Sequence, residues 1–141
     1  MQRIERGDFK WSEMRSAFFS GFHQSLPAFA AAGNNLIVEH IVETEAWMLL
    51  LLELLHPIDV FFIGVHCPLA ELERREIERG DRRIGEARQD FYTAHKFTTY
   101  DLEIDSMEPI ALNVEKAISS WRTRTRPNAF DYMLSVMRDQ T

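Results

Sequence analysis

Apolar side chains return every three or four positions over residues 12–32, which is the spacing of a helix with one apolar face. Pro27 predicts a kink inside this helix because proline has no amide hydrogen to donate. Gly33 predicts the end of the helix, since glycine readily adopts the left-handed conformation found there. The residues that carry the apolar period are Met14, Phe18, Phe22, Leu26 and Phe29.

Shorter apolar runs predict three strands. The run Leu36–Val38 is apolar and rich in β-branched residues, which favours a short buried strand that ends at Glu39-His40. The run Asp59–His66 is apolar throughout, a pattern typical of a parallel strand buried on both faces. The run Tyr100–Asp105 alternates apolar and acidic residues, which favours a last strand.

The remaining periodic segments predict helices. The segment Thr44–Leu55 is apolar on nearly every side, so its helix is either fully buried or prone to association. Further helices are expected over residues 68–79, 84–95 and 108–124, with a short one in a C-terminal tail at about 126–141. The order of elements predicts a single α/β domain over residues 1–141, with a three-layer parallel sheet and helices on both faces. Three strands make a thin sheet for that class.

Composition narrows the possible partners. The chain has 141 residues, 45% of them apolar, which argues against disorder. A net charge of −6 argues against nucleic acid as a partner. The single cysteine, Cys67, has no partner for an internal disulfide, and the first residues lack the apolar core of a signal peptide, so we expect a cytoplasmic protein. Polar residues interrupt the most hydrophobic segment, 46–67, so no membrane span is expected.

The carboxyl ends of the three predicted strands are where a ligand is expected, because ligands of open parallel sheets bind at that edge. These ends are Glu39-His40, His66-Cys67 and Asp105-Ser106. Cys67 is interpreted as a small buried apolar residue, and His95 as a side chain that fills the core. A zinc site at His40 with Glu43 has little support, because no HExxH or CxxC motif accompanies the pair.

An arginine-rich segment, residues 76–91, follows the second predicted strand. If the segment is helical, Arg75 and Arg79 share one face with either Arg82 or Arg83. A guanidinium group suits phosphate because its donors match two oxygens and its charge persists at any physiological pH.

A structural role is the alternative for the same arginines. The pairs Glu71–Arg75 and Glu78–Arg82 have the i, i+4 spacing of ordinary surface ion pairs, each contributing about 0.2–0.5 kcal/mol. Spacing alone therefore favours a solvated helix over an anion site.

Four motifs in this part of the chain resemble one enzyme family. They are GVxC at Gly64–Cys67, RExxRGDRxxG at Arg75–Gly85, His95, and YDxExD at Tyr100–Asp105. In this combination they resemble the second half of chloramphenicol phosphotransferases and related P-loop kinases. The resemblance is clearest over residues 61–106 and extends over about 35–120.

This resemblance implies transfer of the γ-phosphoryl group of ATP to a hydroxyl of a small molecule. It implies a lid at about 70–95, with Arg79 and Arg82 as catalytic residues. Arg75 and Arg83 join these two as nucleotide-binding residues. ATP and Mg²⁺ are the cofactors it implies, with Glu39 as the candidate magnesium ligand.

The chain also departs from the family pattern. No G-x-x-x-x-G-K-[ST] motif is present, and none of the three lysines, Lys10, Lys96 and Lys116, follows a glycine. The strand that would carry the base for the acceptor hydroxyl is missing too. We therefore expect an N-terminally truncated P-loop-kinase-like fold that is inactive alone and binds no cofactor by itself. The alternative is a non-catalytic domain that associates with itself as a homo-oligomer, since the lost strand leaves open sheet edges.

Overall fold

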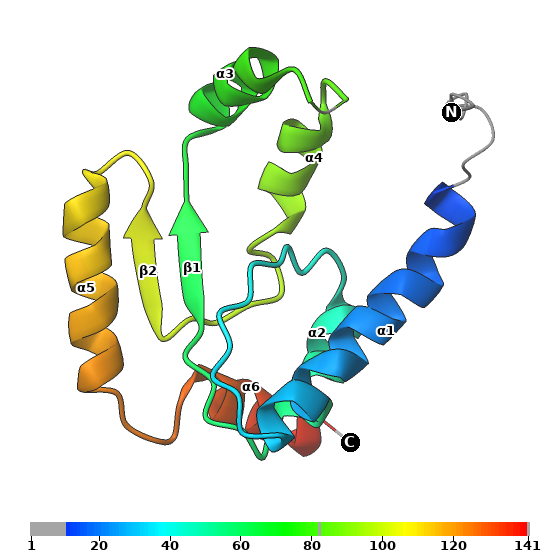
Figure 1. Ribbon diagram of the computed structural model, residues 1–141, viewed down its shortest axis with the longest axis vertical. Coiled ribbons are helices and arrows are strands. Elements are labelled where there is room, and N and C mark those ends of the chain that lie inside the picture. Colours follow the sequence, from blue (N-terminus) through cyan, green and yellow to red (C-terminus); the bar gives the residue numbers. More distant parts are fainter. Residues whose placement is uncertain (1–10, 82, 141) are drawn as a thin grey trace. The chain divides into compact units, whose positions relative to one another are not determined.

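The computed structural model describes residues 11–81 and 83–140, and it contains six helices and two strands within them. By contacts the chain divides into two compact units between Ile37 and Val38, and each is described here by itself. Figure 1 shows the elements in chain order. Within the described residues no helix is long and apolar enough to cross a bilayer.

The first unit consists mainly of helix α1, Trp11–Ala31, and Pro27 lies inside this helix. Gly33 follows the helix with φ +95°, and its amide donates to the carbonyl of Ala30 over 3.0 Å. The side-chain amide of Asn34 donates to the carbonyl of Phe29 over 3.0 Å. These bonds satisfy carbonyls at the helix end, so the predicted stop at Gly33 is confirmed.

The second unit is a mixed α/β arrangement around a small parallel sheet. Strand β1, Ile63–His66, pairs with β2, Leu102–Asp105, in the register Gly64↔Glu103 and His66↔Asp105. Helices α3, Leu69–Arg79, and α4, Glu86–Thr93, connect the two strands. Figure 1 shows both strands pointing toward α3.

Helix α5, Ile110–Arg122, packs against β2. Helix α2, Glu45–Leu55, packs instead against α6, Ala129–Asp139. The apolar core of this unit is centred on the second pair of helices. Its buried apolar side chains are Val42, Met48, Leu51, Leu52, Ala129, Phe130 and Leu134.

Polar bonds at the amino ends of the strands join the sheet to α6. The carboxylate of Asp101 accepts the amide of Phe62 at 2.7 Å and that of Ala129 at 2.8 Å. Asn128 caps α6 in a capping box with Asp131, and its side-chain amide donates to the carbonyl of Val60 over 3.0 Å. Phe62 meets the ring of Phe130 edge to face at 5.2 Å. This end of the sheet is therefore firmly held.

Two strand predictions are wrong. The run Leu36–Val38 forms no strand, and Ile37 is fully exposed, because the run has no neighbouring strand to pair with in the described part of the chain. The run Asp59–His66 was expected to be buried on both faces, but only its second half is a strand and Val65 is 53% exposed. Helix α5 packs against β2, the neighbouring strand, so it leaves Val65 uncovered. Helix α2 buries Met48, Leu51 and Leu52, whereas Leu49 and Leu50 are exposed.

Candidate functional site

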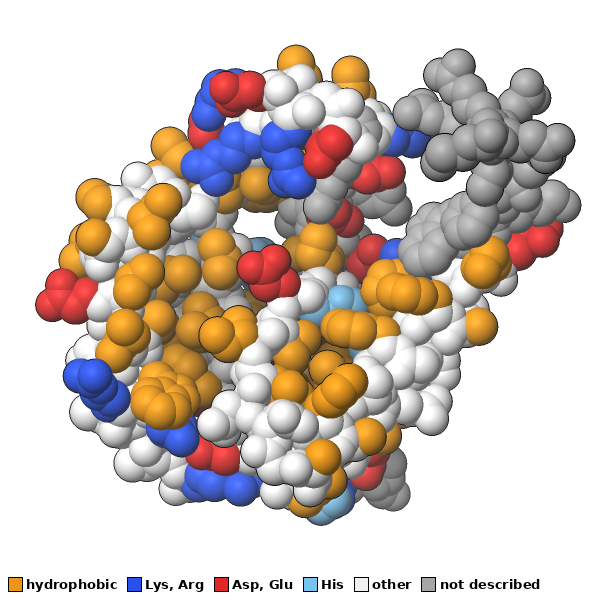
Figure 2. Space-filling view, viewed as in Figure 1, with side chains coloured by type: hydrophobic (Ala, Val, Ile, Leu, Met, Phe, Trp, Pro, Cys, Tyr) orange, Lys and Arg blue, Asp and Glu red, His pale blue; other side chains and the backbone are white. Residues whose placement is uncertain are grey.

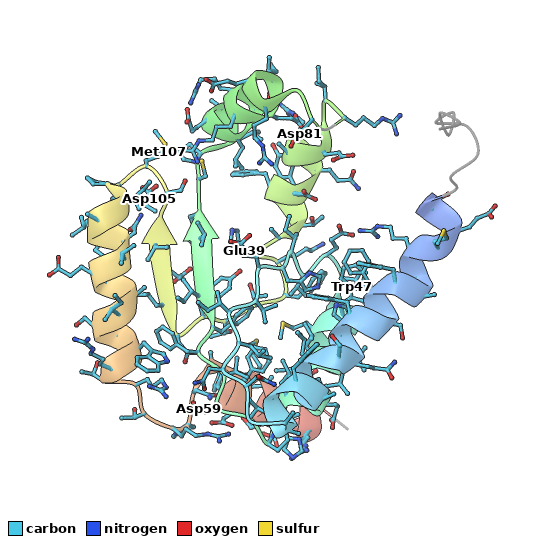
Figure 3. All side chains as sticks on the ribbon, in the orientation of Figure 1. Glu39, Trp47, Asp59, Asp81, Asp105 and Met107 are labelled. Carbon is cyan, nitrogen blue, oxygen red and sulfur yellow. The ribbon has the colours of Figure 1, made fainter. Side chains whose placement is uncertain are left out.

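The carboxyl ends of β1 and β2 meet at one edge of the sheet, as the sequence predicts for His66 and Asp105. The amide of Ser106 donates to the carbonyl of His66 over 2.8 Å, which continues the ladder past the strand ends. The carboxylate of Asp105 accepts the amide of Met107 at 2.8 Å. Figure 3 shows Asp105 and Met107 at the end of β2 nearest to α3, and Asp59 at the opposite end of the sheet.

Glu39-His40 does not end a third strand in the described residues, so the predicted meeting of three strand ends is wrong. Neither residue belongs to a strand, because the run before them pairs with nothing in the described residues. Glu39 is exposed, and the ring of His40 stacks on Trp47 with centroids 5.5 Å apart. No cluster of three His, Cys, Asp or Glu side chains suited to a metal ion occurs over residues 11–81 and 83–140.

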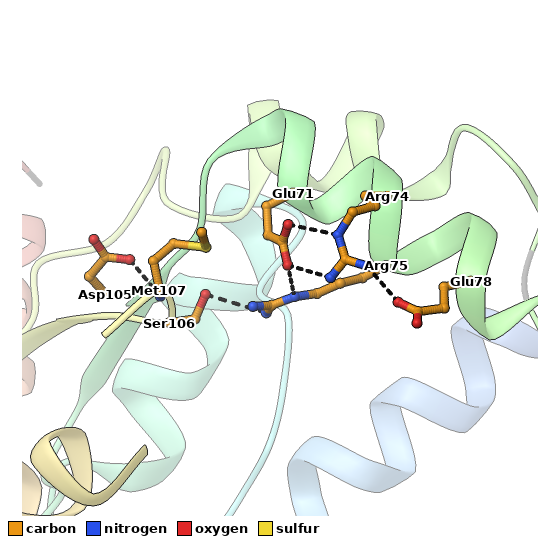
Figure 4. A network of polar contacts seen from close by, with 7 residues as sticks. All are labelled: Glu71, Arg74, Arg75, Glu78, Asp105, Ser106 and Met107. Atoms are coloured by element: carbon orange, nitrogen blue, oxygen red, sulfur yellow. Dashed lines mark hydrogen bonds and ion pairs between the residues drawn. The ribbon is translucent and has the colours of Figure 1, made fainter. Parts of the chain in front are cut away.

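Arg75 links helix α3 to the strand ends. Its Nε donates to Glu71 over 2.7 Å, which confirms the predicted i, i+4 pair, and its Nη1 lies 3.5 Å from the Ser106 hydroxyl (Figure 4). Figure 2 shows Lys and Arg side chains gathered along α3 on the side toward the strand ends. A guanidinium group therefore lies at the edge where a parallel sheet binds its ligand.

Arg74 forms a different set of hydrogen bonds from Arg75. Its guanidinium forms two bonds to Glu71, of 2.8 and 2.9 Å, and a third to Glu78 over 2.7 Å (Figure 4). Hydrogen bonds from Arg74 and then Arg75 lower the pKa of Glu71 to about 2. Because carboxylates occupy both sides of the Arg74 guanidinium, this side chain is poorly placed to bind another anion.

Arg79 and Arg83 lie further along the segment, and both are exposed. Arg79 is the last residue of α3, one turn beyond Arg75 on the same face, and its Nη2 lies 3.2 Å from a carboxylate oxygen of Asp81. Gly80 ends the helix with φ +63°, so Arg83 lies beyond α3 and does not share its face as predicted for a continuous helix. In the described part of the chain Arg83 has no ion pair.

Arg82, the remaining predicted lid residue, lies outside the described residues. The predicted pair Glu78–Arg82 therefore lies outside them too.

Helices α3 and α4 pack on each other and make no comparably extensive contact with another helix or strand of the described residues. The carboxylate of Glu76, buried between them, accepts the amides of Gly85 at 3.1 Å and Ala87 at 2.9 Å. Arg88 of α4 pairs in turn with Glu73 of α3 at 2.9 Å. Within the described residues, α3 and α4 therefore pack mainly on each other.

A cluster of polar rings beside the strand ends was not predicted as a unit. The Nε2 of His66 lies 2.9 Å from a carboxylate oxygen of Glu103, and the ring of His66 stacks on His95 at 4.1 Å. The Nδ1 of His95 is hydrogen bonded to the hydroxyl of Tyr100. Burial lowers the pKa of His95, assisted by the nearby charge of His66, and burial raises the pKa of Tyr100. The side chain of His95 is half-buried, so the prediction that it fills the core is correct only in part.

The geometry of this cluster depends on Gly64. A Cβ atom at this position would lie 2.5 Å from two ring carbons of Tyr100, so only glycine lets the ring lie this close to β1. One feature of the sequence could have indicated this cluster. Gly64, His66 and Glu103 alternate along paired strands, which places them on one face of the sheet once the register is known.

A hollow lies away from the carboxyl ends of the strands. It has a volume of about 440 Å³ and lies between the end of α2 and helix α6. Arg126 in its wall is held by a bidentate pair to Asp131, with bonds of 2.6 and 2.9 Å. The strand ends, with partly free guanidinium groups nearby, are the better candidate site.

Two curated proteins are similar to the chain over most of its length. Two proteins of Mycobacterium tuberculosis, from strains CDC 1551 / Oshkosh and ATCC 25618 / H37Rv, are named "Putative O-phosphotransferase", and each is 30% identical to this chain over 110 residues. The match covers 77% of this chain and 49% of each relative, so the chain spans about half of their length. No solved structure matches significantly.

The family comparison covers more of the chain. The profile of the family described as chloramphenicol phosphotransferase-like protein matches residues 1–121, which include α3, α4, both strands and most of α5. The resemblance carried by the motifs of Gly64–Cys67, Arg75–Gly85 and Tyr100–Asp105 is thereby confirmed. The chain belongs to the chloramphenicol phosphotransferase-like family.

Proposed function

We propose that this chain contributes the lid and the strand edge of an enzyme that transfers the γ-phosphoryl group of ATP to a hydroxyl of a small molecule. The observation that carries the proposal is the approach of Arg75, from α3, to Ser106 at the carboxyl ends of the strands. The names of the curated relatives, which describe O-phosphotransferases, agree with it.

The chemistry needs cationic donors more than it needs a reactive side chain. In phosphoryl transfer the catalyst mainly positions the reactants and stabilises charge on the moving group. Arg75, Arg79 and Arg83 would supply these donors from the lid, and Arg82 is assigned to the same role from its motif. Arg79 is available because an exposed pair such as that with Asp81 contributes little and is easily exchanged for phosphate.

The residues present fit a nucleotide only in part. The arginines suit its phosphates, but the 141 residues contain no G-x-x-x-x-G-K-[ST] loop to cradle them. We propose that a strand and P-loop beside β1, which pairs only with β2 in the described residues, complete a three-layer fold. Magnesium would then be held mainly by phosphate and water, with Glu39 as a further oxygen donor. The chain alone is proposed to be inactive.

An activity assay tests this proposal. The 141-residue chain should show no transfer from ATP to hydroxyl compounds, chloramphenicol included, in a coupled assay for ADP. The same chain preceded by the N-terminal half of a curated relative should show ADP release that depends on the acceptor. Turnover by the chain alone would refute the need for a P-loop, and inactivity of a folded fusion would refute the phosphotransferase role.

Exposed apolar residues favour a second candidate function, a non-catalytic domain that associates with itself. Ile110 of α5 is 82% exposed, and Leu49, Leu50 and Val65 are exposed as well. Burial of such surface contributes about 25 cal/mol per Å², enough to favour a homo-oligomer. A dimer is expected by analytical ultracentrifugation at tens of micromolar, and a single monomeric species would refute self-association.

The proposed class of partner and the proposed location rest on the composition of the chain. A net charge of −6 supports a small-molecule partner over nucleic acid. Cys67 is the only cysteine, which supports a cytoplasmic location because no intrachain disulfide can form.

A further inference from the structure

Glu76 is a buried carboxylate on the otherwise charged and largely exposed helix α3. Its side chain lies between α3 and α4, and the residue is 7% exposed. One oxygen accepts the amide of Gly85 at 3.1 Å and the other accepts the amide of Ala87 at 2.9 Å. These amides lie at the N-terminal end of α4, where backbone donors have no partner within the helix. Glu76 therefore ties the end of one lid helix to the beginning of the other.

These bonds span the connection between α3 and α4, residues 80–85, in or beside which the arginines of the candidate site lie. The connection begins at Gly80, with φ +63°, and ends at Gly85, with φ +103°. Glycines at both ends give the connection conformational freedom that other residues lack. Arg79 lies just before it, and Arg83 lies within it. Among the described residues, the bonds to Glu76 join α3 directly to two of the amides that begin α4.

We propose that Glu76 is a positioning residue for anion binding, which fixes the lid connection so that Arg79 and Arg83 bind one polyphosphate together. The proposal rests on the proposed function, since it assumes that these arginines bind phosphate. Two cationic groups held in place bind a polyphosphate more tightly than two that must be ordered on binding. Because Glu76 already occupies the amides at the beginning of α4, the anion binds to the arginines and not to that helix end.

The proposal makes a prediction opposite to simple electrostatics. Glu76 is a negative charge inside an arginine-rich segment, so its neutralisation should strengthen anion binding if charge alone mattered. If Glu76 positions the arginines, Glu76→Gln should weaken binding, because the two backbone amides bond to different carboxylate oxygens and glutamine replaces one of these oxygens with an NH2 group that cannot accept. The direction of the change therefore separates the two explanations.

Isothermal titration of the full chain with pyrophosphate measures that direction. Glu76→Gln should raise the Kd at least about tenfold, the effect of one lost charge-assisted contact. Glu78→Gln is the matched control, because Glu78 is exposed and its ion pair within the described residues is with Arg74. The Kd of this variant should stay within about twofold of the wild-type value or fall. Ala87→Pro removes a donor amide without changing any charge, and it should also weaken binding.

Hydrogen exchange of the same proteins tests whether Glu76 forms these hydrogen bonds to the amides that begin α4. Backbone amides over residues 80–90 should exchange faster in Glu76→Gln and Ala87→Pro than in the wild type, and at unchanged rates in Glu78→Gln. Unchanged exchange in Glu76→Gln, or equal or tighter pyrophosphate binding by that variant, would overturn the positioning role. If the wild type binds no pyrophosphate while Glu76→Gln still exchanges faster, the tie exists but the proposed phosphate function is overturned, and the positioning role with it.

Discussion

Replacement of Gly64 by alanine should destabilise the sheet by pushing away the ring of Tyr100. The new Cβ would lie 2.5 Å from ring atoms Cδ2 and Cε2, whereas ordinary contacts begin near 3.4 Å, so the ring must move by about 1 Å. A forced shift of this kind costs about 1–3 kcal/mol, and loss of the bond between Tyr100 and His95 costs about 1 kcal/mol more. The expected loss of about 2–4 kcal/mol is a large part of the 5–15 kcal/mol typical of a domain.

Urea unfolding followed by circular dichroism measures this loss. Gly21→Ala is the matched control, because a Cβ there meets nothing within 4 Å and alanine in a helix should stabilise by about 0.5–1 kcal/mol. In a Tyr100→Ala background, Gly64→Ala should cost much less, since the clash is gone. Wild-type stability of Gly64→Ala, or an equal cost in both backgrounds, would refute the close packing of Tyr100 on β1.

Three further perturbations test the rest of the second unit. Because the pKa of His95 is lowered in the folded protein, the contribution of His95 to stability is complete above pH 6.5, the usual pKa of histidine, and decreases as the pH falls below this value. The free energy of unfolding should therefore decrease less from about pH 7.5 to about pH 5.5 in His95→Gln than in the wild type. Asp131, whose pKa Arg126 lowers to about 2, should lose its contribution as the pH falls from about 4 toward 2, and Asp131→Asn should cost about 1 kcal/mol at pH 7 in urea unfolding. Asp101→Ala should cost about 2–4 kcal/mol by the same measurement, because it leaves the amides of Phe62 and Ala129 without their acceptor, and a loss below 0.5 kcal/mol would contradict that role.

Helices were predictable where local signals agree with the final packing. Thr44 and Gly80 mark helix ends by their own chemistry, and the structure confirms both, with Thr44 accepting the amide of Trp47 and Gly80 in the left-handed conformation. The strand at Leu36–Val38 was not predictable in this way. A β-branched run forms a strand only with a partner, and the two-stranded sheet of the described residues offers it none.

The candidate site was predictable to a similar degree. The meeting of His66 and Asp105 follows from two parallel strands, which the sequence indicates. The different partners of Arg74 and Arg75 depend on where Glu71 directs each side chain, which spacing alone does not specify. Likewise, Glu76 looks like any other acidic residue of a charged helix, and its burial becomes apparent only when α4 packs beside it.

The central claim is that lid arginines bind the transferred phosphoryl group, and kcat/KM of lid variants tests it most directly. The measurement requires the chain joined to the N-terminal half of a curated relative, so that a P-loop is present. Arg79→Ala should lower kcat/KM about tenfold or more through loss of a contact worth about 1.5–3 kcal/mol. Arg74→Ala should stay near the wild-type value, because Glu71 and Glu78 already hold Arg74. Equal and small effects of both substitutions would contradict the claim and leave the arginines as part of a solvated helix.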